Sequence, residues 1–260
     1  MRRLLVVGAA AFPLYWALVS SFTPEARLYE SLPLVPTTLE HYRALFAERD
    51  FLRPIVSSLI VAGATTIVCV TLGAAAAYAA ARLRFRGRTL LLGGMLAASM
   101  MPQIALVPPL FELFRALGLI DRYAGLVLSY LAFAMPLTVW LLVGTFRQLP
   151  RDIEEAARVD GAGGLAILFR VVLPLAAPGI AAAAMLTFIF CWNELLFAMS
   201  FTTRPERQTV PVAVALFRGE HQVPWGQILA ATVISTLPVV LLVALFQRRI
   251  VSGLTAGAIR

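Results

Sequence analysis

The sequence has little charge. Of its 260 residues, 14% are charged and 60% are hydrophobic, and the mean hydropathy is +0.84. A water-soluble domain with so little charge would aggregate, so the composition places the chain among membrane proteins. Apolar runs of about 20 residues, each long enough to cross ~30 Å of hydrocarbon as a helix, use up its length. No room is left for a soluble catalytic domain.

Lysine is absent from the sequence. The chain therefore cannot supply the lysine of a G-x4-GK[ST] phosphate loop, and any ATP must be handled by another polypeptide. The net charge of +8 comes from arginines. They are scattered through short loops and do not form one face, so they indicate membrane orientation and not nucleic-acid binding.

Cysteine and histidine are scarce, with two residues of each. Cys69 and Cys191 fall inside apolar runs, where a small thiol packs as a hydrophobe. Their positions predict neither a disulfide nor a metal site.

The N-terminus begins with Met1-Arg2-Arg3 and an apolar run, which is also how a cleavable signal peptide begins. The run from Leu4 to Phe22 is longer than a usual signal core. It contains Pro13 and Trp16, and no A-x-A-like site follows it. We therefore interpret it as a spanning helix.

Six segments of membrane-spanning length lack charge, apart from one acidic residue in the fifth, which predicts an all-α polytopic protein formed by a single transmembrane domain over residues 1–260. They are residues 4–22, 55–81, 89–111, 123–146, 174–201 and 225–246. An even number of spans places both termini on one side. Arg2, Arg3, the Arg82–Arg88 turn, the Arg147–Arg170 segment, Arg248 and Arg249 all fall on that side. The positive-inside rule makes it cytoplasmic, in the inner membrane.

The third span carries Pro102, Pro108 and Pro109, each of which removes a helical hydrogen-bond donor. Broken helices are tolerated at membrane depth where protein or a water-filled cavity satisfies the freed carbonyls. Two interpretations stay open: a bent helix lining a translocation path, with Pro102 and Gln103 as candidate path residues, and a kink that serves helix packing alone.

The cytoplasmic segment 150–174 reads as a short helix, a sharp break and a second short helix. Pro150 stands at its start, and Asp152, Glu154 and Glu155 occupy the first turns, where the helix dipole favours acids. Gly161 supplies a left-handed stop. The pattern is typical of a compact knob that fits a groove of another protein, or of an amphipathic connector on the lipid surface.

The string Glu155-Ala156-Ala157, then Gly161, then Val171-Val172-Leu173-Pro174 resembles the EAA loop of ABC-importer permeases, EAA-x3-G-x9-I-x-LP. The spacing agrees throughout, and Val171 replaces Ile. Four further strings in the expected order are similar to the shorter permease subunit of maltose-type and trehalose-type sugar importers. They are Arg82–Arg88 after the second span, Met101–Phe111 in the broken third span, Cys191-Trp192-Asn193-Glu194-Leu195-Leu196 in the fifth, and Gln247–Thr255 at the C-terminus.

The resemblance implies a type I importer permease fold that moves a sugar, a di- or oligosaccharide such as trehalose or maltose, into the cytoplasm. It also implies four partners besides membrane lipid: a second homologous permease, two copies of an ABC ATPase and an extracytoplasmic sugar-binding protein. ATP and magnesium would be bound by the ATPases, so this chain would hold no cofactor, no metal and no catalytic residue. The implied ATPase-coupling residues are Glu155, Ala156, Ala157, Asp160, Gly161, Leu173 and Pro174.

Trp192, Asn193 and Glu194 are candidate substrate-path residues near the outer end of the fifth span. The alternative is an interfacial belt, with Trp192 at the headgroups and Glu194 reaching outward.

Two other classes compete. An ion-gradient-driven carrier usually keeps ionisable groups near the bilayer midplane, whereas Glu194 is the acidic residue in a span and lies toward its external end. A membrane-embedded enzyme would need a motif such as H-E-x-x-H, which is absent.

Overall fold

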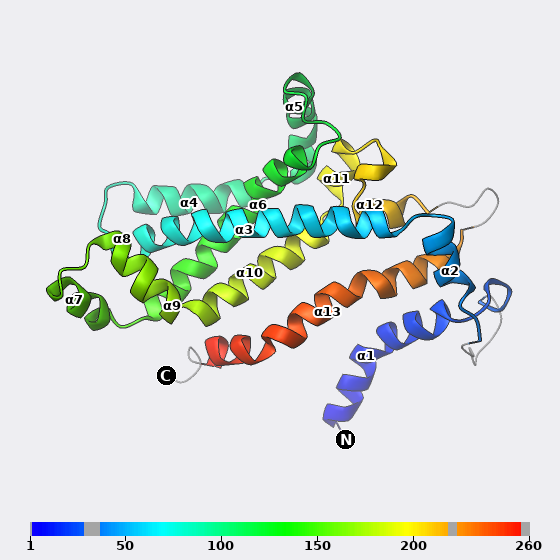
Figure 1. Ribbon diagram of the computed structural model, residues 1–260, viewed down its shortest axis with the longest axis horizontal. Coiled ribbons are helices and arrows are strands. Elements are labelled where there is room, and N and C mark those ends of the chain that lie inside the picture. The colour runs from blue at the N-terminus through cyan, green and yellow to red at the C-terminus, as the bar shows by residue number, and fades with distance from the viewer. Residues whose placement is uncertain (1, 29–36, 218–222, 256–260) are drawn as a thin grey trace. The chain divides into compact units, whose positions relative to one another are not determined.

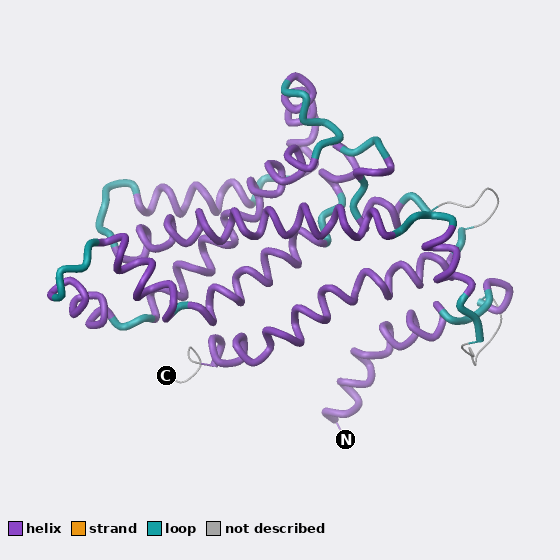
Figure 2. Tube along the Cα trace, in the orientation of Figure 1, coloured by secondary structure: helices purple, strands orange, loops and turns teal. Residues whose placement is uncertain are grey.

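The computed structural model describes residues 2–28, 37–217 and 223–255, and for residues 2–7, 10 and 247–255 the backbone alone. Helices joined by turns and loops form this part of the chain, and it contains no β-strand (Figures 1 and 2). The all-α prediction is confirmed. The chain folds as two compact units, Met1–Ser57 with Arg204–Leu241 and Ser58–Thr203 with Leu242–Arg260.

The first unit contains α1 and the helices that follow it before the long helix α3. Its elements are α1 (Arg2–Ser21), η1 (Glu25–Arg27), α2 (Glu40–Ala47), the start of α3 (Leu52–Arg82), η3 (Pro205–Arg207), α12 (Val210–Ala215) and most of α13 (Trp225–Thr255). Glu25 joins two of these elements, because its carboxylate accepts hydrogen bonds from the backbone N–H groups of Trp225 and Gly226 at 3.0 and 2.9 Å. It thereby satisfies two of the free donors at the start of α13.

The second unit is built around α6, which packs against α4 and α10. Its elements, besides α3, are α4 (Arg88–Ser99), α5 (Gln103–Ala116), α6 (Tyr123–Gln148), α7 (Arg151–Val159), α8 (Gly164–Ile167), the π-helical turn η2 (Leu168–Val172), α9 (Leu173–Leu175), α10 (Ala177–Trp192) and α11 (Leu196–Phe201). Small residues let these helices approach closely. A Cβ at Gly73 would touch Thr138, and one at Gly179 would overlap with Thr145.

Two buried hydroxyls inside this unit, those of Thr138 and Thr187, are satisfied locally. Thr138 and Thr187 lie on α6 and α10 with 2.7 Å between their hydroxyl oxygens, and each oxygen is 2.8 Å from a carbonyl one turn back. One hydroxyl donates to the other, and the second donates to its carbonyl. Because a helix in lipid must satisfy its polar groups internally, these contacts let α6 and α10 carry hydroxyls at no cost in unpaired donors.

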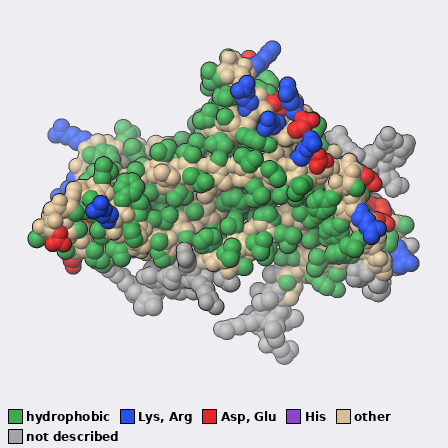
Figure 3. Space-filling model, viewed as in Figure 1, with side chains coloured by type: hydrophobic (Ala, Val, Ile, Leu, Met, Phe, Trp, Pro, Cys, Tyr) green, Lys and Arg blue, Asp and Glu red, His purple; other side chains and the backbone are tan. Residues whose placement is uncertain are grey.

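Three helices of the described residues are long and apolar enough to cross a membrane: Leu52–Arg82, Tyr123–Gln148 and Trp225–Phe246. Two bent pairs qualify if each is counted as one span. The bend is 94° between α4 and α5 and 79° between Gly164–Leu175 and α10. Large hydrophobic side chains such as Ile67, Leu90 and Leu245 are exposed, and Figure 3 shows hydrophobic side chains over most of the visible face. Such a surface requires lipid around it.

Two of the predicted spans can be compared directly with the helices. The third predicted span, 89–111, is the bent pair, and it breaks where Pro102 precedes α5 with extended backbone at ψ 119°. Pro108 and Pro109 lie inside α5 without ending it. Helix α1 covers the first predicted span, 4–22. The number of spans and the single domain over residues 1–260 stay predictions.

Candidate coupling surface and translocation path

Helix α7 forms where the sequence places it, between Pro150 and Gly161. Asp152 and Glu154 lie in its first turn and Arg158 in its last, which matches the helix dipole at both ends. The helix stops at Gly161, whose φ of +84° is in the left-handed region. The N–H of Gly161 donates to the Arg158 carbonyl at 3.0 Å and that of Ala162 to the Ala157 carbonyl at 2.9 Å, so the last carbonyls of α7 are satisfied.

The coupling residues that the sequence nominates divide into two sets. Glu155, Ala156, Asp160, Gly161 and Pro174 are exposed. Ala157 and Leu173 are half-buried and pack against the hydrophobic core of the second unit. Ala157 therefore holds α7 to its own protein and is not fully available to a partner.

Three hydrophobic residues that sequence reasoning missed stand out from the same segment: Val159, Leu165 and Phe169, with exposed fractions of 87%, 74% and 63%. They flank the Gly161 turn on α7, α8 and η2. We call these three, with the exposed residues of α7, the coupling surface. Their signal was present in the sequence as apolar residues beside Asp160, Gly161 and Arg170, where a solvent-facing connector would be polar.

Glu154 was also missed, and its environment differs from that of its neighbour Glu155. Its carboxylate is buried beside Arg82, which ends α3, with Nε 2.6 Å from Oε1 and both side chains 5% exposed. The N–H does not point along this line, so the contact is an ion pair and not an aligned hydrogen bond. Tyr78 donates its hydroxyl to the other carboxylate oxygen at 3.2 Å.

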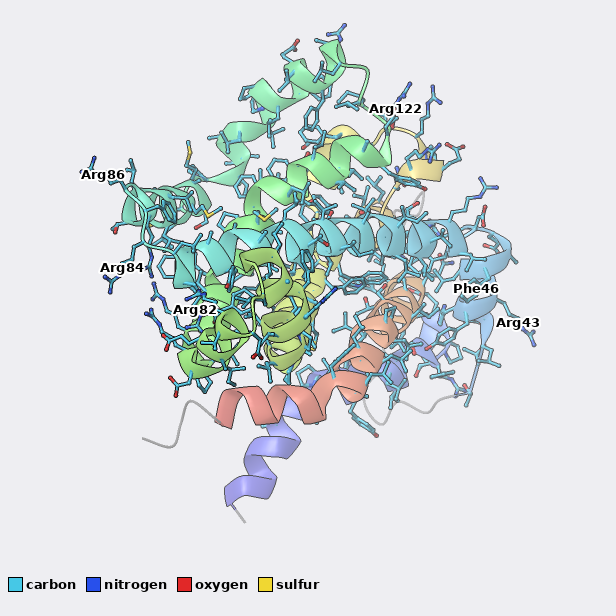
Figure 4. The ribbon with its side chains drawn as sticks, turned by 60° about the vertical axis from the view of Figure 1, so that its left-hand side comes forward. Arg43, Phe46, Arg82, Arg84, Arg86 and Arg122 are labelled. Carbon is cyan, nitrogen blue, oxygen red and sulfur yellow. The ribbon has the colours of Figure 1, made fainter. Side chains whose placement is uncertain are left out.

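Arg82 makes a further contact at the end of α6. Its Nη2 donates to the carbonyl oxygen of Leu149 at 2.8 Å. Figure 4 shows Arg82 beside the α7–α8 segment, whereas Arg84 and Arg86 of the adjoining turn point away from the protein. One guanidinium thus joins the ends of α3, α6 and α7.

Trp192, Asn193 and Glu194 occupy three different environments at the end of α10. Trp192 is 3% exposed and stacks on Phe188 with 5.6 Å between ring centroids. Asn193 is exposed, and its amide donates to the Ile189 carbonyl at 2.8 Å. Glu194 is 8% exposed. The burial of Trp192 and Glu194 is opposite to what the interfacial-belt alternative requires.

Glu194 turns back to cap the next helix. Its two carboxylate oxygens accept hydrogen bonds from the N–H groups of Phe197 and Ala198, at 2.9 and 3.1 Å. These are free donors at the start of α11, and an acid there is favoured by the helix dipole. Of the string, Asn193 alone presents an exposed polar side chain.

Pro102 and Gln103 lie on a different element, at the break before α5. Pro102 is exposed and Gln103 half-buried. Helix α11 packs against both α5 and α6, with Phe114 and Phe201 in edge contact at 5.3 Å. The two groups of path candidates therefore come from neighbouring elements of one unit.

Titratable side chains do not gather into a metal-binding group. Across the described residues, no three His, Cys, Asp or Glu side chains lie close enough to hold an ion. The C-terminal tail from Arg248, which the family resemblance makes a candidate for a second contact with the ATPase, falls where the backbone alone is described. Its last residues, 256–260, lie outside the described residues.

Comparison with known proteins gives a consistent result. The Trehalose transport system permease protein SugB of Mycobacterium tuberculosis is 44% identical over 98% of this chain and 94% of its own length. The Trehalose/maltose transport system permease protein MalG of Thermococcus litoralis is 42% identical over 100% and 97%. The Sulfoquinovosyl glycerol transport system permease protein SmoH of Agrobacterium fabrum is 40% identical over 99% and 90%.

A solved structure confirms the fold. It is the crystal structure of a bacterial ABC transporter involved in the import of the acidic polysaccharide alginate, which matches with a TM-score of 0.78 over 94% of this chain and 92% of that one, at 22% identity. Residues 52–255 match the family described as Binding-protein-dependent transport system inner membrane component. This match favours the importer interpretation over the ion-driven carrier. The chain belongs to that family and is a multi-pass permease component of the inner membrane.

Proposed function

We propose that this chain is the permease subunit of an ATP-driven importer that moves a di- or oligosaccharide such as trehalose or maltose into the cytoplasm. Two of its relatives are named for trehalose or for trehalose and maltose. A neutral polyol needs a path of aromatic and uncharged hydrogen-bonding groups, and the apolar helices of this chain carry few charges.

The proposed complex contains a second homologous permease, two copies of an ABC ATPase and an extracytoplasmic sugar-binding protein. The family is defined by dependence on a binding protein, which supports the last of these. The ATPases would bind ATP and magnesium and carry out hydrolysis, since this chain lacks the lysine of a phosphate loop. It would hold no cofactor of its own.

The observation that carries the proposal is the coupling surface. Val159, Leu165 and Phe169 expose apolar side chains around a helix stopped at Gly161, next to arginines that mark the cytoplasmic side. Exposed apolar residues rimmed by charge are typical of a protein interface. A groove of the ATPase would receive this surface, together with Glu155, Ala156, Asp160 and Gly161, and closing of the ATPase dimer would move the attached helices.

The sugar path is proposed to include Asn193, which is exposed, with Gln103 and Pro102 on the neighbouring element. Glu194 and Trp192 are buried beside Asn193 and would support its position without contacting the sugar. With both termini in the cytoplasm, as the arginine distribution predicts, Asn193 would lie in the outer part of the path.

Reconstitution into liposomes tests the function. The permease pair, the ATPase and the binding protein should take up labelled trehalose or maltose only when ATP is supplied on the ATPase side. Uptake should persist when a protonophore and a sodium ionophore collapse ion gradients. Uptake driven by an ion gradient without the ATPase would contradict the proposal. Transport of sulfoquinovosyl glycerol, and of neither trehalose nor maltose, would show that the substrate is the one for which SmoH is named.

A further inference from the structure

The buried ion pair between Arg82 and Glu154 lies outside the Glu155-Ala156-Ala157 string. Glu155 is exposed, whereas Glu154 points into the second unit, where Arg82 and Tyr78 meet its two oxygens. Of these two adjacent carboxylates on α7, that of Glu155 therefore faces outward, toward the proposed partner, and that of Glu154 faces the protein's own core. The outward one belongs to the proposed coupling surface, and the inward one has no part in it.

The covalent connections of α7 are extended or turned at both ends. Leu149 and Pro150 link it to α6 with ψ angles of 137° and 136°, and Gly161 and Gly163 stand between α7 and α8. The glycines leave the second link easy to deform. In the first link Pro150 fixes its own φ, but the ψ angles of Leu149 and Pro150 lie outside the helical region and can still change, so this link transmits a displacement less well than a continuous helix would. Arg82 braces the first link directly, since it donates to the Leu149 carbonyl while it pairs with Glu154.

Burying two charges is a poor way to gain stability. Desolvation offsets much of the attraction in a buried pair, and apolar residues of similar size are often as good. What a buried pair does provide is one fixed arrangement, since any shift leaves a charge unpaired in the interior. This cluster is therefore better suited to fixing the position of α7 than to stabilising the fold.

We propose that Arg82, Glu154 and Tyr78 form a tether that makes α7 move as one body with the ends of α3 and α6. When the ATPase displaces α7, the tether transmits that displacement to α3 and α6. Without the tether, the Leu149–Pro150 link would absorb it. Arg82 and Glu154 are positioning residues, and the inference rests on the coupling role proposed for α7.

The test is the number of ATP molecules hydrolysed per sugar transported in liposomes containing the whole transporter. In Glu154→Gln the ATPase should still bind the coupling surface and hydrolyse ATP, while less of the motion reaches the spans. The ratio should rise by about 2- to 30-fold, the fold-change that corresponds to the ~0.5–2 kcal/mol typical of residues that carry coupling between sites. Arg86→Gln is the matched control, because Arg86 is exposed in the turn that follows Arg82 and its loss should leave the ratio unchanged.

Two further variants keep the test decisive if Glu154→Gln assembles poorly. Tyr78→Phe removes one hydrogen bond and leaves the charges in place, and it should raise the ratio by a smaller factor. The double variant Arg82→Glu with Glu154→Arg exchanges the two charges. Its ratio should lie between that of either single variant and that of the unmodified transporter, because the ion pair is rebuilt but the Leu149 contact is not.

A purely structural role gives a different result. If the variants that assemble lower hydrolysis and uptake together at an unchanged ratio, the tether is wrong. Val159→Asp, which alters the coupling surface, should lower both together at an unchanged ratio. The proposed function fails separately, in the unmodified transporter, if ATP drives no uptake.

Discussion

At the scale of single residues, the Glu194 side chain shows how one break in a helix decides a role. Because α10 ends at Trp192 and α11 starts at Leu196, Glu194 falls just before a new helix and its carboxylate bonds back to Phe197 and Ala198. A continuous helix would have pointed the same residue elsewhere. Sequence reasoning singled out the string and left a path residue and an interfacial belt open, and it did not foresee a helix cap.

The first prediction compares Glu194 with Asn193. Glu194→Ala should lower the free energy of unfolding by about 1–3 kcal/mol, because a cap is lost and buried N–H groups are left without acceptors. Asn193→Ala should leave the unfolding temperature nearly unchanged and raise the sugar concentration needed for half-maximal uptake. Thermal unfolding in detergent and uptake by reconstituted transporter measure both.

Glu194→Gln keeps one acceptor oxygen and serves as the intermediate variant. If Glu194→Ala proved as stable as the unmodified protein, the carboxylate would not be acting as a cap. Normal uptake in Asn193→Ala would remove Asn193 from the proposed path.

The second prediction concerns the stop of α7. Gly161→Val should reduce both sugar uptake and sugar-stimulated ATP hydrolysis, because a β-branched residue at φ +84° costs at least ~1–2 kcal/mol and would unwind or redirect the helix end. Nothing lies within 4 Å of a Cβ built at Gly161, so the effect would be conformational and not a clash. Gly161→Asn is the control, since asparagine tolerates this conformation, and it should retain most activity.

Wild-type uptake in Gly161→Val would mean that α7 needs no defined end. Ala157→Arg tests the same element from its inner side. Its charged side chain would have to enter the core that Ala157 packs against, so it should displace α7 and lower transport while the spans stay folded.

At the scale of elements, the exposed turn at η3 offers a third prediction. Pro205, Glu206 and Arg207 are exposed between Thr202 and Pro224, and residues 218–222 lie outside the described residues. The arginine distribution predicts that this loop is external, and we propose that it contacts the sugar-binding protein. Shortening the chain around Arg204–Gln208 should weaken stimulation of ATP hydrolysis by the binding protein and leave the basal rate unchanged. Equal stimulation in the shortened variant would make the loop a plain connector.

Helix positions were predictable where a local signal exists. Pro150 and Gly161 bound α7, and Pro102 starts α5, because proline fixes its own φ and glycine tolerates the left-handed conformation that ends a helix. The tether was not predictable, since it joins Arg82 and Glu154 across 72 residues of sequence, and the charge pattern assigned both to an exposed arginine-rich side. Ala157 was assigned to the partner's side because the EAA string nominates all of its residues together, and a linear motif does not say which of them pack inward.

At the scale of the whole molecule, the fourth prediction is topological. The arginine-rich Arg82–Arg88 turn and the coupling surface should face the cytoplasm, with both termini. A cysteine introduced at Arg86, in a variant without Cys69 and Cys191, should react with an impermeant thiol reagent in inside-out vesicles and not in intact cells. A cysteine at Arg204 should behave in the opposite way. Labelling at Arg86 from outside would reverse the orientation.

Helix α6 also sets a fixed distance between two arginines at its ends. Arg122 precedes it and Arg147 lies in its last turn, so a rise of 1.5 Å per residue places the two arginines about 38 Å apart. A typical bilayer is ~40–45 Å thick with its headgroups. In a thinner bilayer α6 would have to tilt, and α7, two residues further on, would change its depth below the membrane.

Lipid thickness would then set the height at which the ATPase meets α7. We expect transport to show an optimum acyl-chain length when the complex is reconstituted into phosphatidylcholines of graded length. The lipid would in this way act as a regulator of coupling without binding at any one site.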